Sequence, residues 1–302
     1  EMSFSKGGDK PQVPVNPMGQ RYMEIHQKAN PETGPRSRGS RAKAQLRLAE
    51  KTETDVSALA RDFQESVDKL EREYVPRKEP FHPPRPGEAA WQAKYIDEYV
   101  PKRVVTSNIA ARAQESGLIL EGEGEIGYVD REIKPVRTTK GTKPKKGSGI
   151  DLRLDLLLAQ GDRPIVAEVK CRGDENAYYA LIQSLAAAAQ LSPKLQRKRL
   201  TWAYGEGRDE NENTVELSET KAIAVWLILS RHNSRGEEKR QMFELTRRIS
   251  RKLMRNKDFR RYVSEIRCVW AADLEDEPVR LAEEPFEFKG EIDDRLRGWC
   301  AK

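Results

Sequence analysis

The sequence predicts an α/β protein in which helices flank a mixed β-sheet and a helical extension precedes it. Residues 149–171 alternate apolar and polar side chains in two runs separated by residues 160–163, which is typical of two antiparallel strands. Residues 174–191 then follow a helical pattern that ends before Pro193. The most apolar run of the chain, 222–229, indicates a buried strand.

The composition bounds the class of protein. The chain has 302 residues, of which 37% are hydrophobic and 34% charged, so we expect one core with long solvated extensions. The net charge of +6 is compatible with a polyanionic partner. Cys171, Cys268 and Cys300 form no close pair, which argues against a disulfide framework or a cysteine zinc site and favours a reducing compartment, cytoplasmic or nuclear. We find no apolar run of membrane-spanning length and no signal-peptide pattern.

The chain divides into four predicted parts. Residues 1–40 are rich in Pro, Gly, Ser, Lys and Arg, so we expect a disordered basic arm. Residues 41–100 form a helical extension, which a Pro-rich linker interrupts at 75–87. Its helix over 41–74 carries a heptad seam that either packs against the core or joins two copies in a homodimer or larger complex. Residues 101–272 form the main domain and 273–302 an acidic tail. The seam residues are Val56, Ala60, Phe63, Val67, Leu70 and Tyr74.

The remaining elements of the main domain follow from the same patterns. A helix over 106–117 begins at Thr106 or Ser107 and ends at Gly117. A strand is expected over 125–136, an amphipathic helix over 236–256 and a last strand over 265–271.

The predicted hairpin brings two acidic residues together. If 160–163 is the loop, Ala159 faces Pro164, and Asp155 then faces Glu168. Directly opposed Cβ atoms lie about 4.5–5.5 Å apart, at which two carboxylates repel each other. A divalent cation would offset this repulsion, because Mg²⁺ takes carboxylate oxygens as ligands. Lys170 shares their face, and this combination suits phosphodiester hydrolysis.

A plainer interpretation of the same face stays open. Lys170 and Arg153 could neutralise the two acidic residues in a surface ion-pair ladder. Each exposed pair of that kind contributes only about 0–1 kcal/mol. The aliphatic character of both strands favours a central position in the sheet and therefore the catalytic interpretation.

Asp155 followed by Glu168-Val169-Lys170 is similar to the D…(D/E)-x-K signature of the restriction-endonuclease-like (PD-(D/E)XK) nuclease superfamily, over about residues 106–271. The resemblance implies a restriction-endonuclease-like mixed β-sheet and a Mg²⁺ (or Mn²⁺) dependent nuclease. It assigns Asp155 and Glu168 to the metal and Lys170 to catalysis. Leu154 stands where the family's proline would be.

Two further residues follow from the resemblance. Many members carry a glutamate on the helix before the sheet that reaches the metal, and Glu115 could fill that role or face solvent. Gln183 lies near the position of a glutamine found in RecB-like members, but Ala187 replaces the tyrosine that follows it there.

Two basic segments are candidates for nucleic-acid contact. The loop at 134–149 has six basic residues and no acidic one, which suits a phosphate clamp; the alternative is a solvated loop. The basic face of the helix over 236–256 contacts nucleic acid or is merely solvated. The candidate residues are Lys140, Lys143, Lys145, Lys146, Arg251 and Arg255.

The leading interpretation is a Mg²⁺-dependent nuclease, an endonuclease that acts on DNA rather than RNA. The alternatives are a ribonuclease and a non-catalytic nucleic-acid-binding or assembly protein that retains the fold. The sequence contains no H-E-x-x-H motif, no Walker loop and no G-x-G-x-x-G that opens a helix after a strand.

Overall fold

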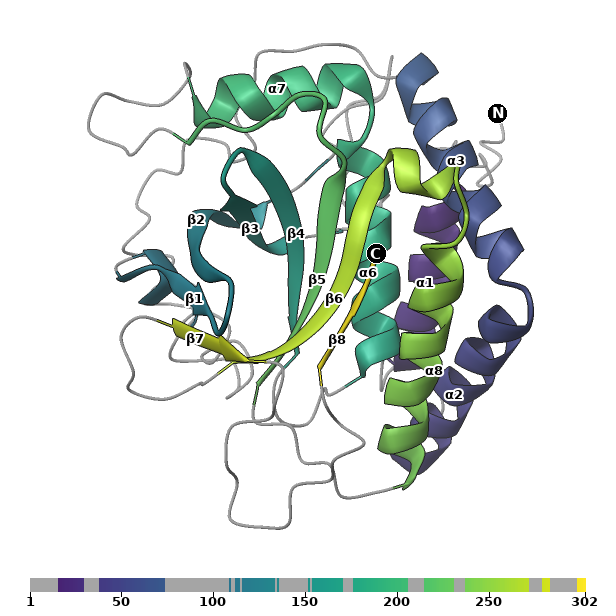
Figure 1. Cartoon of the computed structure of the whole chain (residues 1–302). Helices are drawn as coiled ribbons and strands as arrows, with labels where there is room; N and C mark the ends of the chain where they lie inside the picture. Colours follow the sequence, from purple (N-terminus) through teal and green to yellow (C-terminus); the bar gives the residue numbers. More distant parts are fainter. Residues whose placement is uncertain are drawn as a thin grey trace, which may run out of the picture.

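The computed structural model describes most of the main domain and much of the segment before it (Figure 1). The described residues are 16–29, 38–73, 109, 112–114, 116–133, 135, 152, 154–170, 176–205, 215–230, 237–271, 279–282 and 298–302. The helices are α1 (Pro17–Ala29), α2 (Arg38–Thr54), α3 (Val56–Glu73), α6 (Ala177–Leu191), α7 (Lys194–Tyr204), α8 (Glu237–Leu253) and the 3-10 helix η1 (Phe259–Arg261). The strands are β1 (Leu118–Leu120), β2 (Gly124–Ile133), β3 (Leu154–Gln160), β4 (Arg163–Lys170), β5 (Ile223–Ser230), β6 (Val263–Ala271), β7 (Val279–Ala282) and β8 (Trp299–Ala301).

Seven of these strands close into a mixed β-barrel, in the order β5-β4-β3-β2-β1-β7-β6 with β6 paired again to β5. The expectation of an open, restriction-endonuclease-like sheet is therefore wrong. The closing strand β7 lies within 273–302, which composition marks as an acidic tail, and it pairs parallel to β1 and antiparallel to β6. β8, from the same segment, pairs with β6 beside β7. Residues 279–282 and 299–301 of the predicted acidic tail therefore belong to the sheet and not to a separate tail.

The central hairpin β3–β4 has the expected register. Ala159 lies opposite Pro164, and Gln160 lies opposite Arg163. The two residues between them make the turn, and Gly161 adopts a φ of 58°, a left-handed conformation that glycine tolerates without strain. The prediction of an antiparallel hairpin is confirmed.

The hairpin separates two apolar clusters. Leu156 and Ile165 face a cluster inside the ring of strands, together with Trp226 of β5. Leu157 and Val166 face the opposite way, into a cluster that includes residues of α1, α3, α6 and α8. Alternation along β3 and β4 puts Asp155, Glu168 and Lys170 on this helix-covered side. The candidate site therefore lies outside the barrel, under the helical layer.

Helix α6 is the innermost helix of this layer, and α1, α3 and α8 pack around it (Figure 1). Asn176 caps its N-terminus by accepting a hydrogen bond from the backbone N–H of Tyr179 at 2.9 Å. Its alanine run, 186–189, is completely buried, so the small side chains let the helix approach β4 and β5 closely. The expected helix over 174–191 is confirmed with a start at Ala177.

The segment before the barrel differs from expectation in two ways. Residues 17–29, expected within a disordered arm, form α1, because Met18, Tyr22 and Ile25 share one face and are buried. The helix expected over 41–74 is divided at Asp55, whose side chain accepts a hydrogen bond from the backbone N–H of Ala58 and so starts a new helix.

The described seam residues of α3, from Val56 to Leu70, are buried. Most of them belong to the same apolar cluster as α6, so this seam packs within the chain. The linker at 75–87 lies outside the described residues.

The other strand and helix predictions agree with β2, β5, α8 and β6 to within a few residues. Among the helices in the described part of the chain, none has the length and apolar character needed to cross a membrane.

Candidate functional site

The structure brings the two acidic residues of the hairpin together. The paired register of β3 and β4 ends with Leu156 opposite Ala167, and Asp155 and Glu168 are the next positions on their strands. The Asp155 side chain reaches across the hairpin, where its Oδ2 accepts a hydrogen bond from the backbone N–H of Val169 at 2.9 Å. The two carboxyl groups are close enough for each to interact electrostatically with the other. Glu168 is only 1% exposed and Asp155 is partly buried, so the pair lies at the border of the interior.

Lys170 completes the cluster. Its Nζ lies 2.5 Å from Oε1 of Glu168, donates a hydrogen bond to Oε1 of Gln183 at 3.2 Å, and sits 4.6 Å from the ring centroid of Tyr179. The lysine is 5% exposed. A carboxylate, an amide oxygen and an aromatic face thus hold one ammonium group in a buried position.

The electrostatics of Glu168 indicate a place for more positive charge. Burial raises the pKa of the Glu168 carboxyl well above its ordinary value, the neighbouring Asp155 carboxylate raises that pKa further, and Lys170 opposes both effects. The Oε2 atom of Glu168 is buried and has no hydrogen-bond partner. A buried carboxylate oxygen without a partner is costly, and a cation beside it removes that cost.

Helix α1 contributes residues that sequence analysis missed. Tyr22 stacks on Tyr179, with ring centroids 6.0 Å apart and 12° between the planes, and Nδ1 of His26 lies 2.8 Å from the Tyr179 hydroxyl. Burial raises the pKa of Tyr22, and Glu168, Lys170 and Asp155 are close enough to influence that pKa as well. A signal was available, because Met18, Tyr22 and Ile25 have the i, i+4, i+7 spacing of a helix face. The Pro-rich context hid it.

Of the other predicted site residues, the structure describes only Arg251 and Arg255. Glu115 and the loop residues Lys140, Lys143, Lys145 and Lys146 lie outside the described residues. Arg251 lies in the last turn of α8 and Arg255 in the turn that follows it, and both are exposed.

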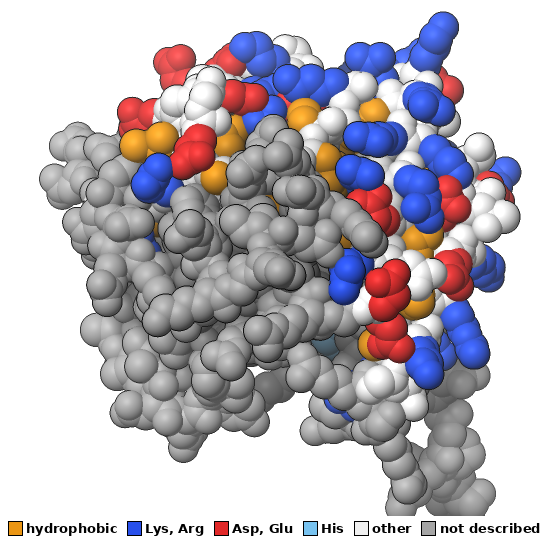
Figure 2. All heavy atoms as spheres, turned by 60° about the horizontal axis from the view of Figure 1, so that its bottom comes forward, with side chains coloured by type: hydrophobic (Ala, Val, Ile, Leu, Met, Phe, Trp, Pro, Cys, Tyr) orange, Lys and Arg blue, Asp and Glu red, His pale blue; other side chains and the backbone are white. Residues whose placement is uncertain are grey.

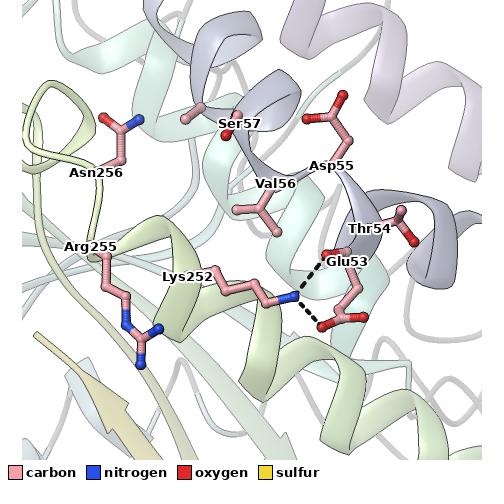
Figure 3. A pocket seen from close by; sticks show the side chains of 9 residues that line it. Glu53, Thr54, Asp55, Val56, Ser57, Lys252, Arg255 and Asn256 are labelled. Carbon is pink, nitrogen blue, oxygen red and sulfur yellow. Dashed lines mark hydrogen bonds and ion pairs between the residues drawn. The ribbon is translucent and has the colours of Figure 1, made fainter.

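Arg255 lines a pocket of about 280 Å³ where the junction of α2 and α3 meets α8 (Figure 3). Glu53, Asp55, Lys252 and Asn256 also line this pocket. The carboxylate pair of the hairpin does not line it.

The carboxylate pair fits one class of metal ion better than others. Within the described ranges, no group of three or more His, Cys, Asp or Glu side chains could hold a metal ion. This donor set is poor for structural zinc, which takes four side-chain ligands. Mg²⁺ is usually held by one or two carboxylates together with water and substrate phosphates, so Asp155 and the unpartnered oxygen of Glu168 are compatible with it.

The site therefore consists of two close carboxylates, a lysine fixed beside them, and an aromatic and amide surround provided by α6 and α1. Comparisons with protein-family models, with curated proteins and with solved structures find no match to this chain.

Proposed function

We propose that this protein is a Mg²⁺-dependent nuclease that hydrolyses phosphodiester bonds, with DNA favoured over RNA as the substrate and an endonuclease mode of action. The observation that carries the proposal is the buried contact between Glu168 and Lys170 beside Asp155. The D…(D/E)-x-K motif anticipates this grouping, and the proposal rests on the local arrangement and not on the barrel.

Each residue of the cluster has a role in the proposed reaction. Asp155 and Glu168 would hold Mg²⁺ or Mn²⁺, which when bound supplies an activated water and neutralises charge on the phosphate. Lys170 provides a fixed positive charge for the phosphate oxygens as negative charge develops on them. Gln183 and Tyr179 keep the ammonium group beside the carboxylates, so that no reorganisation is needed.

Cleavage of supercoiled plasmid DNA tests this proposal. Wild-type protein is expected to nick and linearise the plasmid with Mg²⁺ or Mn²⁺ but not with EDTA, and Asp155→Asn and Lys170→Met are expected to be inactive. Asp162→Asn is a matched control, because Asp162 is a carboxylate of the same hairpin that pairs with Lys221 away from the cluster. Equal cleavage by all four proteins would show that a contaminating enzyme is responsible, and the proposal would fall.

A second candidate is a nucleic-acid-binding or assembly protein without catalytic activity. The favouring observation is that Lys170 already neutralises Glu168 and that both side chains are buried, an arrangement that needs no metal. This candidate predicts metal-independent binding and intact DNA and RNA after long incubation. A ribonuclease would instead cleave labelled RNA in preference to labelled DNA under the same conditions.

A further inference from the structure

Helices α2 and α8 pack against each other on the outside of the helical layer (Figure 1). Three pairs of side chains join them. Gln241 of α8 donates a hydrogen bond to Glu50 of α2 at 3.2 Å, and Lys252 and Arg248 both pair with Glu53. These contacts fix the outward faces of the two helices relative to each other.

The outward face of α2 is a basic stripe. Lys43, Arg47 and Lys51 occur every four residues, so they lie on one side of the helix, about 6 Å apart along its axis. All three are exposed, and none has a carboxylate partner among the described residues. Within the described ranges, therefore, no acidic side chain neutralises these three cations.

The end of α8 continues this charge. Arg251 and Arg255 are exposed and likewise have no carboxylate partner in the described part of the chain. Figure 2 shows Lys and Arg side chains as the most frequent charged type over the right-hand part of the molecule, with fewer acidic side chains among them. The surface formed by these five residues, Lys43, Arg47, Lys51, Arg251 and Arg255, is called the α2–α8 basic face below.

Helix α2 also connects this face to the carboxylate site. Gln45, between Lys43 and Arg47, accepts a hydrogen bond from Asn176, the cap of α6, at 2.7 Å. Three residues further on, Tyr179 contacts Lys170. Gln45 is buried on the inward side of α2, opposite the exposed stripe, so α2 itself joins the basic face to the end of α6 that borders the carboxylates.

We infer that the α2–α8 basic face is the surface on which a DNA duplex docks, with Lys43, Arg47 and Lys51 of α2 as phosphate contacts. This inference rests on the proposed function for its partner, and it adds a surface that the motif does not contain. Duplex DNA presents closely spaced phosphates, which rows of unpaired cations bind without regard to sequence.

An acidic membrane surface is a poorer match to the same face. Helices that lie on membranes present large apolar side chains next to their cations. Among the described residues, Ile119 of β1 is the only exposed large hydrophobic side chain, and it lies on the barrel.

The test compares three double variants that each remove two cations. They are Lys43→Gln/Arg47→Gln on α2, Arg251→Gln/Arg255→Gln on α8, and the control Lys194→Gln/Lys198→Gln on α7, whose lysines are exposed away from this face. Binding of a short fluorescein-labelled DNA duplex is measured by anisotropy in EDTA, between about 50 and 200 mM salt.

The α2 and α8 variants are each expected to lower the slope of log K against log salt by about 1.8 and to weaken binding at least about tenfold, because each phosphate contact contributes about 0.9 to the slope. The control is expected to match the wild type. Equal losses in all three variants, or no loss in the α2 variant, would overturn the inference, because binding would then follow net charge or another surface.

Two further arms separate the possible failures. Phosphatidylserine vesicles or polyglutamate that compete as well as DNA at equal charge would overturn the inference in favour of another anionic partner. If DNA binding depends on the α2 cations but the wild type never cleaves DNA, the docking surface stands and the proposed nuclease activity falls. If cleavage depends on Asp155 but neither binding nor cleavage depends on the α2 cations, the nuclease activity stands and the docking surface falls.

Discussion

Replacing Lys170 by methionine is expected to destabilise the fold by about 3–5 kcal/mol near pH 8. The methionine fills a similar volume but leaves the Glu168 carboxylate, which is 1% exposed, beside Asp155 without a cation. Losing one partner of a buried ion pair costs about that much, whereas an exposed pair contributes only about 0–1 kcal/mol. The 2.5 Å contact of Nζ with Oε1 and the burial of both side chains favour the larger value.

The stability loss in Lys170→Met is also expected to depend on pH, which gives an independent check of the same prediction. Burial and Asp155 raise the pKa of Glu168, so a folded protein without Lys170 binds a proton there more readily than the unfolded chain does. Because the folded variant binds this proton more tightly than the unfolded chain, its free energy of unfolding increases as the pH falls. The difference in unfolding free energy between the wild type and Lys170→Met is therefore expected to become smaller as the pH is lowered from about 8 to about 5.

Urea denaturation followed by circular dichroism measures these effects in wild type, Lys170→Met, Glu168→Gln and the double variant. Glu168→Gln/Lys170→Met is expected to be more stable than Lys170→Met alone, because it removes the buried charge that the single variant leaves unpaired. A loss below about 1 kcal/mol at both pH values would refute the reasoning, since the pair would then behave as a solvated one.

Three other outcomes are expected. Mg²⁺ should raise the melting temperature of the wild type in a thermal-shift assay but not that of Asp155→Asn, because a ligand of the folded state stabilises it by mass action; equal shifts would argue against a site at Asp155. Glu123→Gln should lower the free energy of unfolding by no more than about 1 kcal/mol near neutral pH, since the Glu123 side chain is 36% exposed. The hydrogen bond with Arg267 lowers the pKa of Glu123, so the loss should vanish at a pH below that pKa; urea midpoints at neutral and at acidic pH would measure both. An undiminished cost in acid would contradict this pairing. The buried Cys268 thiol, whose pKa burial raises, should resist iodoacetamide until urea unfolds the chain, while the half-buried Cys300 serves as the internal reference in mass spectrometry; rapid labelling of native Cys268 would show that β6 opens.

The hairpin was predictable because its information is local. Strict alternation and a Gly-Asp turn define the register, and the register alone brings Asp155 and Glu168 together. The same holds for the buried strand β5 and for α6, whose patterns extend over eight and fifteen residues.

Closure of the barrel was not predictable from local pattern. β1 has three residues and β7 has four, too few for a periodic signal, and they meet across more than half of the chain. Pairing between such distant segments is decided by the packing of the whole domain and not by the propensity of either strand. The acidic composition around β7 indicates solvent and masks its buried Val279 and Leu281.

The surround of the site was missed for a related reason. Tyr179 could be placed on a helix, but nothing in its neighbourhood shows that Tyr22 and His26 lie against it, since 153 residues separate His26 from Tyr179. Only the assembled helical layer brings α1 to the end of α6.

The long separation between α1 and its partners has a consequence for biosynthesis. Translation at about 5–20 residues per second delivers α1 and α3 roughly five to thirty seconds before the ribosome completes β4 and α6. During that interval the side chains of Met18, Ile25 and Phe63, which are buried in the finished molecule, can be shielded only by the contacts that α1, α2 and α3 make with one another. The carboxylate cluster therefore cannot assemble until α6 has been synthesised, although its first aromatic residue, Tyr22, is among the earliest parts of the chain to be made.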